Sequence, residues 1–337
     1  MQFQVPIQIE HPDTQINYRD KILLIGSCFT EHIGNTLEEL KFSLLQNPNG
    51  ILFDPISVCK SLVSYIENKQ YSESDLFHLN EVWHSWQHHS RFSNTDKKQC
   101  LHKINTSQTK AHEFLKAADW VIITFGSSFS YRLKKFEESS KIHSSEELKE
   151  VANCHRAPAQ WFQKHLLEID EIISALEECF KKLLQFNKKL KFIFTLSPVR
   201  HIRDGVIENN RSKARLIESV HHLVNKYEQA YYFPAYELVI DVLRDYRFYD
   251  ADLVHPNYMA TEFVLEKFSE TCLDEEARIL MDKIKQIVIA RKHKALQPKT
   301  KAHRSFLEAH YAKAKALQNQ FPFLNLSEEL FYFSQHS

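Results

Sequence analysis

A serine, an aspartate and a histidine in this sequence have the types and spacing of a nucleophile and the pair that activates it. Ser27 comes directly after KILLIG, an apolar run that ends in Gly26. Asp252 and His255 lie three positions apart in YDADLVHPNY, a spacing that places both side chains on one side of a turn. A serine hydroxyl becomes a useful nucleophile only when a positioned base takes its proton, and a third group must fix the tautomer of that base. The order Ser, Asp, His along the chain also recurs in α/β hydrolases.

Each of these residues also has a purely structural interpretation. For Ser27 it is a helix N-cap, with Gly26 closing a tight turn, and for Asp252 and His255 it is the closure of a loop. Cys28 is a second candidate nucleophile, because a thiolate at a helix N-terminus is activated by the helix dipole. Adjacent residues at a helix start point in different directions, so only one of the two can face His255. We favour Ser27 as the nucleophile and expect Cys28 to be a small buried hydrophobe.

Five short apolar runs rich in β-branched or aromatic residues predict buried strands. Their hydrophobicity is continuous rather than alternating, which is typical of a parallel sheet covered on both faces. Helical patterns lie between them, and this alternation predicts a three-layer α/β/α sandwich with a mainly parallel sheet of about five strands. The expected strands are 21–26, 42–46, 120–126, 191–199 and 230–234, and the expected helices lie near 30–40, 55–68, 108–117, 159–187 and 209–228.

The residues that follow the first four runs are the first candidates for a site, because ligands of open α/β sheets bind outside the carboxyl ends of the strands. Only five glycines occur in 337 residues, and three of these four segments contain one. A chain so sparing of glycine is expected to keep it where positive φ or close backbone approach requires it. The four segments are Gly26-Ser27, Asn47-Pro48-Asn49-Gly50, Gly126-Ser127-Ser128 and Ser197-Pro198-Val199-Arg200-His201.

Length and composition limit the classes of protein. We expect a main domain over 1–275 with an insertion around 70–110, and a helical C-terminal extension over 276–337, where charged helical patterns continue without a strand. Lys+Arg and Asp+Glu balance at 43 each, so neither nucleic acid nor a membrane is an expected partner. The six cysteines form no CxxC pair and the N-terminus lacks a signal-peptide pattern, which favours a cytoplasmic protein. The predicted chemistry requires no cofactor.

The segment WHSWQHHSRF (83–92) combines aromatic, imidazole and guanidinium groups within the expected insertion. His84 and His88 have the i, i+4 spacing of a metal site on a helix, but no Cys, Asp or Glu nearby completes one, so we expect no metal. We predict instead a lid or pocket wall whose aromatic faces suit an apolar or sugar moiety. The residues assigned to it are Trp83, Trp86, His89 and Arg91.

Three further residues are candidates for substrate contact. His155 follows Cys154 on an expected loop, where contact with substrate and a packed, hydrogen-bonded histidine are equal alternatives. Arg200 and His201 follow the fourth strand in the basic stretch SPVRHIRDGVIENNRSKA. An arginine binds a carboxylate or phosphate through two parallel hydrogen bonds, so these two residues are predicted to hold an anionic substrate group.

The motif Gly26-Ser27-Cys28-Phe29 resembles the opening motif of the GSCFA domain, a branch of the SGNH (GDSL-like) hydrolase superfamily. The resemblance implies an SGNH/flavodoxin-like fold in which Ser27 is the nucleophile, Asp252 the acid and His255 the base. It extends over most of residues 20–270, through Asn47-Pro48-Asn49-Gly50, Trp83 to Phe92, Gly126, Asn153-Cys154-His155, Ser197-Pro198-Val199-Arg200-His201 and Asp252-Leu253-Val254-His255-Pro256.

The same resemblance implies an oxyanion hole. Gly50 corresponds to the second-block glycine whose backbone N–H helps to hold the oxyanion, and the Ser27 N–H at a helix N-terminus is the other expected donor. SGNH enzymes usually have an Asn in a Gly-x-Asn-Asp third block, where this chain has Gly126-Ser127-Ser128-Phe129. The third donor is therefore left open between Ser127, Ser128 and Asn153.

Together these observations predict a serine esterase that cleaves an O-acyl or O-acetyl ester of a small molecule or glycan through an acyl-enzyme on Ser27. Two alternatives use the same fold. An acyltransferase would pass the acyl group to a sugar or amine, and water exclusion by the 83–92 segment would favour it. A catalytically silent ligand-binding protein is favoured by the missing third-block Asn. The sequence does not predict the acyl chain, the alcohol portion or the oligomeric state.

Overall fold

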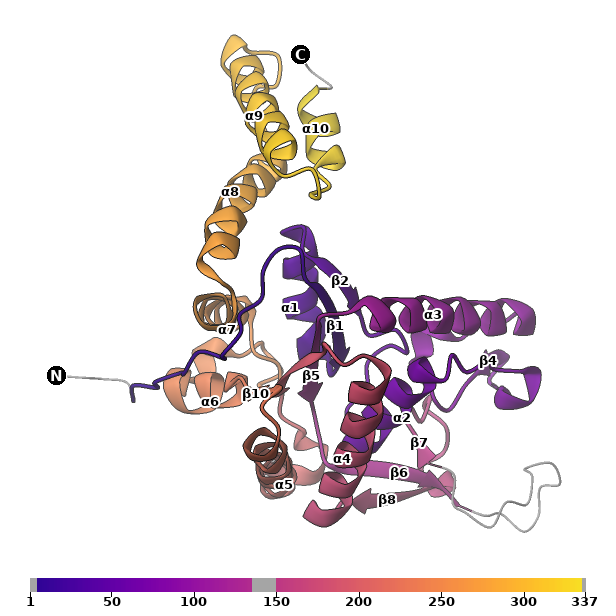
Figure 1. Cartoon of the computed structure of the whole chain (residues 1–337). Coiled ribbons are helices and arrows are strands. Elements are labelled where there is room, and N and C mark those ends of the chain that lie inside the picture. The colour runs from indigo at the N-terminus through magenta and orange to yellow at the C-terminus, as the bar shows by residue number, and fades with distance from the viewer. Residues whose placement is uncertain (1–4, 135–149, 335–337) are drawn as a thin grey trace.

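A five-stranded parallel sheet forms the centre of the protein (Figure 1), whose computed structural model describes residues 5–134 and 150–334. The strand order is β10-β9-β5-β1-β2, and each neighbouring pair is parallel. The predicted fold class is therefore confirmed. The strands are β1 (Lys21–Gly26), β2 (Ser43–Gln46), β5 (Trp120–Phe125), β9 (Lys191–Leu196) and β10 (Ala230–Tyr232).

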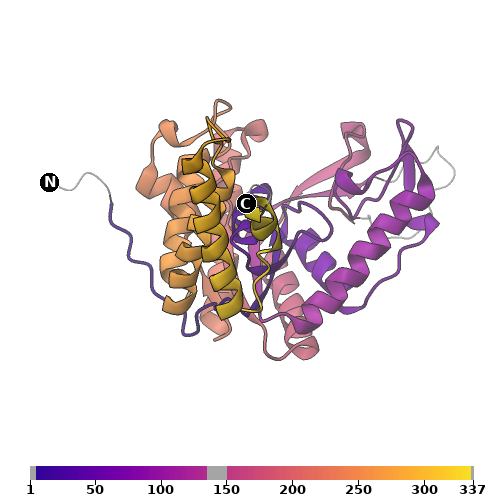
Figure 2. The same cartoon turned by 90° about the horizontal axis from the view of Figure 1, so that it is seen from above.

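Side chains of the central strands alternate between two hydrophobic clusters, one on each face of the sheet. Ile22 and Leu24 of β1 join a cluster with helices α1 (Cys28–Glu39) and α7 (Tyr258–Cys272), whereas Leu23 and Ile25 join the other. Figure 2 shows the orange and gold helices of the C-terminal third and the purple α3 on opposite sides of the molecule. The helices of the second cluster are α2 (Pro55–Ile66), α3 (Lys97–Ala117), α4 (Ile169–Phe186) and α5 (Gly205–Lys226).

Capping residues in the sequence set where several helices begin. The Asp54 carboxylate accepts a hydrogen bond from the Ser57 N–H at 3.0 Å, and Pro55 occupies the first turn of α2. The Asn257 side chain caps α7 in the same way, directly after the loop that carries Asp252 and His255. That loop therefore ends at a fixed point of the fold.

Two parts of the chain differ from the sequence prediction. Residues 159–166, expected to be helical, form a short 3-10 turn and a strand, and α4 begins only at Ile169 because Glu168 and Glu171 form a capping box there. Residues 70–110, expected to be an insertion or long loop, contain a hairpin and the first two thirds of α3, which begins after its N-cap Asp96. The additional strands are β3 (Phe77–Leu79), β4 (Val82–His84), β6 (Phe129–Leu133), β7 (Glu150–Val151) and β8 (Phe162–Leu166), which form a two-stranded and a three-stranded antiparallel sheet.

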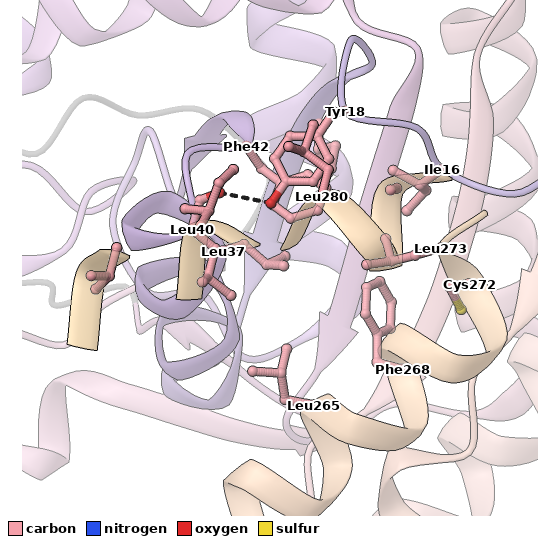
Figure 3. Close-up of a cluster of buried hydrophobic side chains, with 14 of the residues drawn as sticks. Ile16, Tyr18, Leu37, Leu40, Phe42, Leu265, Phe268, Cys272, Leu273 and Leu280 are labelled. Atoms are coloured by element: carbon pink, nitrogen blue, oxygen red, sulfur yellow. Dashed lines mark hydrogen bonds between the residues drawn. The ribbon is translucent and has the colours of Figure 1, made fainter. Parts of the chain in front are cut away.

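Three helices form the C-terminal region and stand above the sandwich in Figure 1, so the predicted helical extension is confirmed. Their buried side chains share one hydrophobic cluster with α7 and with the N-terminal residues Ile16 and Tyr18. Figure 3 shows part of this cluster, where the Tyr18 hydroxyl donates to the Leu40 carbonyl oxygen at 2.9 Å. Among the described residues no helix is long and apolar enough to cross a membrane. The three helices are α8 (Glu275–Lys292), α9 (Lys301–Gln320) and α10 (Ser327–Ser334).

A buried carboxylate ties these helices to the sandwich. The Glu329 side chain on α10 is 0% exposed and forms ion pairs with Lys41 Nζ at 3.0 Å and with Arg291 Nε at 3.3 Å. Lys41 lies between α1 and β2, and Arg291 lies on α8. One carboxylate thus joins three elements that are far apart in the sequence.

Replacing Glu329 by Gln is expected to destabilise the chain by about 2 kcal/mol, because Lys41 and Arg291 lose their buried counter-charge. The cost is below the roughly 3–5 kcal/mol of a fully buried pair, since both cations reach solvent. Urea unfolding followed by circular dichroism measures it. Glu328→Gln is the matched control, because Glu328 pairs with the same two cations but is exposed. Equal midpoints for the two variants would contradict the assignment.

Candidate active site

The chain turns off β1 through a glycine that no other residue can replace without strain. Gly26 has φ 141°, and a Cβ at this position would overlap the carbonyl oxygen of Thr124 on the neighbouring strand β5. Its N–H donates to the Asn47 Oδ1 atom at 2.8 Å. The turn therefore places Ser27 at the carboxyl end of β1, pressed against β5.

Ser27 occupies the N-cap position of α1, but its hydroxyl does not cap the helix. The side chain is 1% exposed, and its Oγ has no hydrogen-bond partner among the described residues. Its Cβ would lie 3.4 Å from a Cβ built on Gly126, the residue after β5. A buried hydroxyl without a partner costs about 1–3 kcal/mol, so this position is not explained by stability.

Asp252 and His255 form a close pair on the loop before α7. The Asp252 Oδ2 and His255 Nδ1 atoms are 2.6 Å apart, and Oδ1 accepts hydrogen bonds from the N–H groups of Val254 and His255. Hydrogen bonds from the His255 backbone N–H, which has the largest effect, and from the His255 ring lower the pKa of Asp252 to about 2. The carboxylate therefore stays ionised at neutral pH and can fix the ring orientation. Both side chains are exposed, at 49% and 43%.

Ser27 and His255 lie at the same edge of the sheet but are not hydrogen-bonded to each other. The Arg200 N–H donates to the Val254 carbonyl oxygen at 3.2 Å, which holds the His255 loop beside the end of β9. Strand β9 pairs with β5, and β5 pairs with β1, which ends at Ser27. The Ser27 Oγ still lacks a partner among the described residues, so the two groups must approach before a proton can pass between them.

The two predicted backbone oxyanion donors have hydrogen-bond partners within the protein. The Ser27 N–H donates to Thr124 O at 3.1 Å, and the Gly50 N–H donates to Asn47 O at 2.7 Å. The side chains of the three candidates for the third donor also form hydrogen bonds, although Asn153 does so through its acceptor oxygen. Ser127 Oγ is 3.2 Å from Ser212 Oγ, Ser128 Oγ donates to Ser212 O at 3.1 Å, and Asn153 Oδ1 accepts from the His155 N–H at 2.9 Å.

Part of the aromatic segment lies against the loop that carries Gly50. The His89 N–H donates to the Asn49 carbonyl oxygen at 2.8 Å, and a Cβ on Gly50 would overlap the Cβ of His89. Arg91 pairs with Glu31 of α1, whose carboxylate also accepts a hydrogen bond from the Asn47 side chain. His89 and Arg91 are therefore next to the carboxyl ends of β1 and β2.

Trp83, Trp86 and His155 lie elsewhere, in two different clusters. Trp83 packs with the Tyr71 and Cys100 side chains. Trp86 stacks on Phe77 with the ring centres 3.6 Å apart. It also lines a cavity of about 680 Å³ between α2, α4 and residues 71–87. His155 is buried against this cluster, with Nε2 2.8 Å from the Ser85 carbonyl oxygen. Neither Ser27 nor His255 lines that cavity. Because Trp83 and Trp86 pack in separate clusters and His89 and Arg91 lie by the Gly50 loop, the four residues predicted as one pocket wall do not form one wall.

Arg200 and His201 border the sheet edge in different ways. The Arg200 guanidinium lies 4.5 Å from the centre of the Tyr249 ring, and His201 meets the edge of the Phe53 ring. Burial, and then the positive charge of Lys213, lower the pKa of His201 to about 4. His201 is therefore neutral at physiological pH.

Cys28 is half-buried and packs against the hydrophobic cluster of α1 and α7. Burial raises the pKa of its thiol, with weaker opposing effects from backbone N–H groups. A thiol kept protonated is a poor nucleophile, which supports the interpretation of Cys28 as a buried hydrophobe. In the part of the chain that the structure describes, no group of three His, Cys, Asp or Glu side chains could hold a metal ion.

Sequence reasoning missed the most unusual side chain at this edge, Lys213 of α5. It is 2% exposed, and its Nζ donates to the carbonyl oxygens of Gly126 and Ser197, both at 2.6 Å. These carbonyls belong to the residues that follow β5 and β9. A signal was present in the sequence: Lys213 falls on the buried face of α5, four positions after Asn209 and three before Leu216.

The fold and this edge define an α/β protein whose candidate site lies at the carboxyl ends of parallel strands. The chain belongs to the GSCFA family, whose model matches residues 21–268. A second model, described as GSCFA domain protein, C-terminal domain, matches residues 284–336, which covers the second half of α8 and all of α9 and α10. No curated protein matches the chain.

Gly26→Ala is expected to destabilise the protein by more than about 3 kcal/mol, because strain at positive φ adds to overlap with the β5 backbone. Gly205→Ala is the matched control: Gly205 also has positive φ, 88°, but a Cβ there meets nothing within 4 Å, so the cost is only the backbone strain of about 1–3 kcal/mol. Urea unfolding of both variants gives the comparison. A Gly26→Ala variant as stable as Gly205→Ala would refute the close approach.

Proposed function

We propose that this GSCFA protein is a serine esterase of the SGNH type, with Ser27 as nucleophile, His255 as base and Asp252 as its orienting acid. The observation that carries the proposal is the Asp252–His255 pair, 2.6 Å apart, held at the sheet edge where Ser27 also lies. The buried, unpartnered Ser27 hydroxyl supports it, because functional sites are where such polar groups are tolerated.

The reaction begins when His255 takes the proton of Ser27 Oγ, which attacks the ester carbonyl carbon. The tetrahedral intermediate collapses as the alcohol leaves with that proton, and the acyl group stays on Ser27. Water then attacks the acyl-enzyme with His255 again as base, which releases the carboxylic acid and restores Ser27. Asp252 keeps the imidazole in the tautomer that this cycle needs and stabilises the imidazolium.

A catalytically silent binding protein is the second candidate function. The observation that favours it is the engagement of the Ser27 and Gly50 N–H groups with carbonyl oxygens, which leaves both predicted oxyanion donors occupied. Transfer of the acyl group to a sugar or amine uses the same acyl-enzyme, so product analysis with an added acceptor separates transfer from hydrolysis. The activity assays below separate both enzymes from the binding protein.

Ser27→Ala is expected to lower the rate of aryl acetate hydrolysis by about 10³-fold or more. The assay follows release of the aryl alcohol by absorbance, with protein folding checked by circular dichroism. Cys28→Ala is the matched control, since it removes the adjacent thiol and should retain turnover. Turnover that survives Ser27→Ala but is lost in Cys28→Ala would make the thiol the nucleophile.

His255→Gln is expected to lower kcat by about 10³-fold, and Asp252→Asn by about 10²-fold or more, because the base and its orientation are lost. His222→Gln is the control: His222 is an equally exposed histidine that pairs with a carboxylate, Glu177, but lies on α5. It should leave kcat unchanged. A large loss in His201→Gln with none in His255→Gln would move the base to the buried imidazole beside Phe53.

A further inference from the structure

We propose that Lys213 is a catalytic residue whose ammonium stabilises the negative charge that develops on the substrate carbonyl oxygen. This inference rests on the proposed function and supplies the donor that Gly126-Ser127-Ser128 does not. No bond to Lys213 forms or breaks. Its part in the reaction is a charge-assisted hydrogen bond that is stronger to the oxyanion than to the neutral ester, which is how such a group accelerates acyl transfer.

The position of the Lys213 Nζ atom carries the argument. It lies between the carboxyl ends of β5 and β9 and donates to Gly126 O and Ser197 O at 2.6 Å each. An ammonium has three N–H donors, so two are used and one remains for a ligand. Among the described residues no carboxylate pairs with Lys213, although burying an unpaired ammonium is costly.

The serines of the divergent third block explain how Lys213 reaches this position. The Ser128 N–H donates to Ser212 Oγ at 2.8 Å, and Ser128 Oγ donates to the Ser212 carbonyl oxygen. These bonds fasten the segment after β5 to α5, and Lys213 is the next residue of that helix. The block therefore docks the helix that carries the cation, in place of offering an amide of its own.

Gly126 connects Lys213 to the nucleophile. Its carbonyl oxygen accepts a hydrogen bond from Lys213. A Cβ built on Gly126 would point toward the Cβ of Ser27 and the ring of Phe53, so these groups lie beside it. The backbone N–H groups of Ser27 and Gly50 donate to other carbonyls. Lys213 is therefore a buried charged donor at this edge, bonded to the residue that contacts Ser27. A cation in a site screened from water acts on a developing oxyanion with little reorganisation.

The surroundings of Lys213 make its charge sensitive to pH. Burial lowers the pKa of Lys213 to about 7, and the Cys28 thiol of α1 weakly opposes the shift. The other groups that face it are His201, after β9, and the Tyr236 ring, with its centre 5.7 Å away. The ammonium is lost as pH rises through about 7, so the oxyanion donor should be lost in the same range.

The experiment compares kcat and KM for an aryl acetate in wild type, Lys213→Met and Lys226→Met between pH 6 and 9. Lys213→Met keeps a long apolar side chain and is expected to lower kcat about 10²–10³-fold with little change in KM. It should also remove the fall of kcat on the alkaline side that wild type shows. Lys226→Met, an exposed lysine on the same helix, should keep both the rate and the fall.

Lys213→Gln, which keeps a donor without the charge, repeats the comparison if Lys213→Met does not fold by circular dichroism. A folded Lys213 variant with wild-type kcat and an unchanged pH profile overturns the inference but leaves the esterase intact. Wild type that shows no Ser27-dependent turnover overturns the proposed function, and the role of Lys213 falls with it.

Discussion

The close approach of two neighbouring strands at Gly26 is the constraint on which the rest of the site depends. A side chain there would overlap the Thr124 carbonyl oxygen, so only glycine lets β1 and β5 keep their register to the sheet edge. The chain then leaves the sheet at a positive φ and begins α1 at once. The Ser27 side chain is consequently buried against Gly126, and a hydroxyl that would normally cap the helix has no partner.

Two buried polar groups at this edge lower the stability of the folded protein. Among the residues that the structure describes, the Ser27 hydroxyl is buried without a hydrogen bond and the Lys213 ammonium is buried without a carboxylate. Each opposes folding, because burial removes water that neither neighbouring strand fully replaces. Structures retain such groups where a ligand or a reaction uses them, and here both lie where an open parallel sheet binds its ligands. The exposed Asp252–His255 pair lies at the same edge, and the proposed acyl transfer would use it together with the buried serine.

The sequence predicted the central sheet well, because continuous apolar runs such as WVIITF are buried on both faces and leave little choice of structure. The helix predicted over residues 159–166 is wrong, because pairing with Phe129–Leu133 overrides the helical pattern there. Helix α4 begins only after its N-cap Glu168. At the site, Ser27 and the Asp252–His255 pair follow from local spacing. Sequence spacing could not reveal that Trp83 and Trp86 pack in separate clusters. It also could not reveal that the Lys213 side chain of α5 bonds to the residues after β5 and β9, because both features depend on tertiary contacts.

The central claim is that Ser27 is an activated nucleophile, and covalent labelling tests it most directly. Folded wild-type protein would be incubated with a fluorophosphonate, and the adduct located by mass spectrometry of its peptides. The account predicts one phosphonyl group per chain, on Ser27, with labelling that is lost on unfolding and much slower in His255→Gln. A folded protein that stays unlabelled, or that is labelled on Cys28 or another residue, would contradict it.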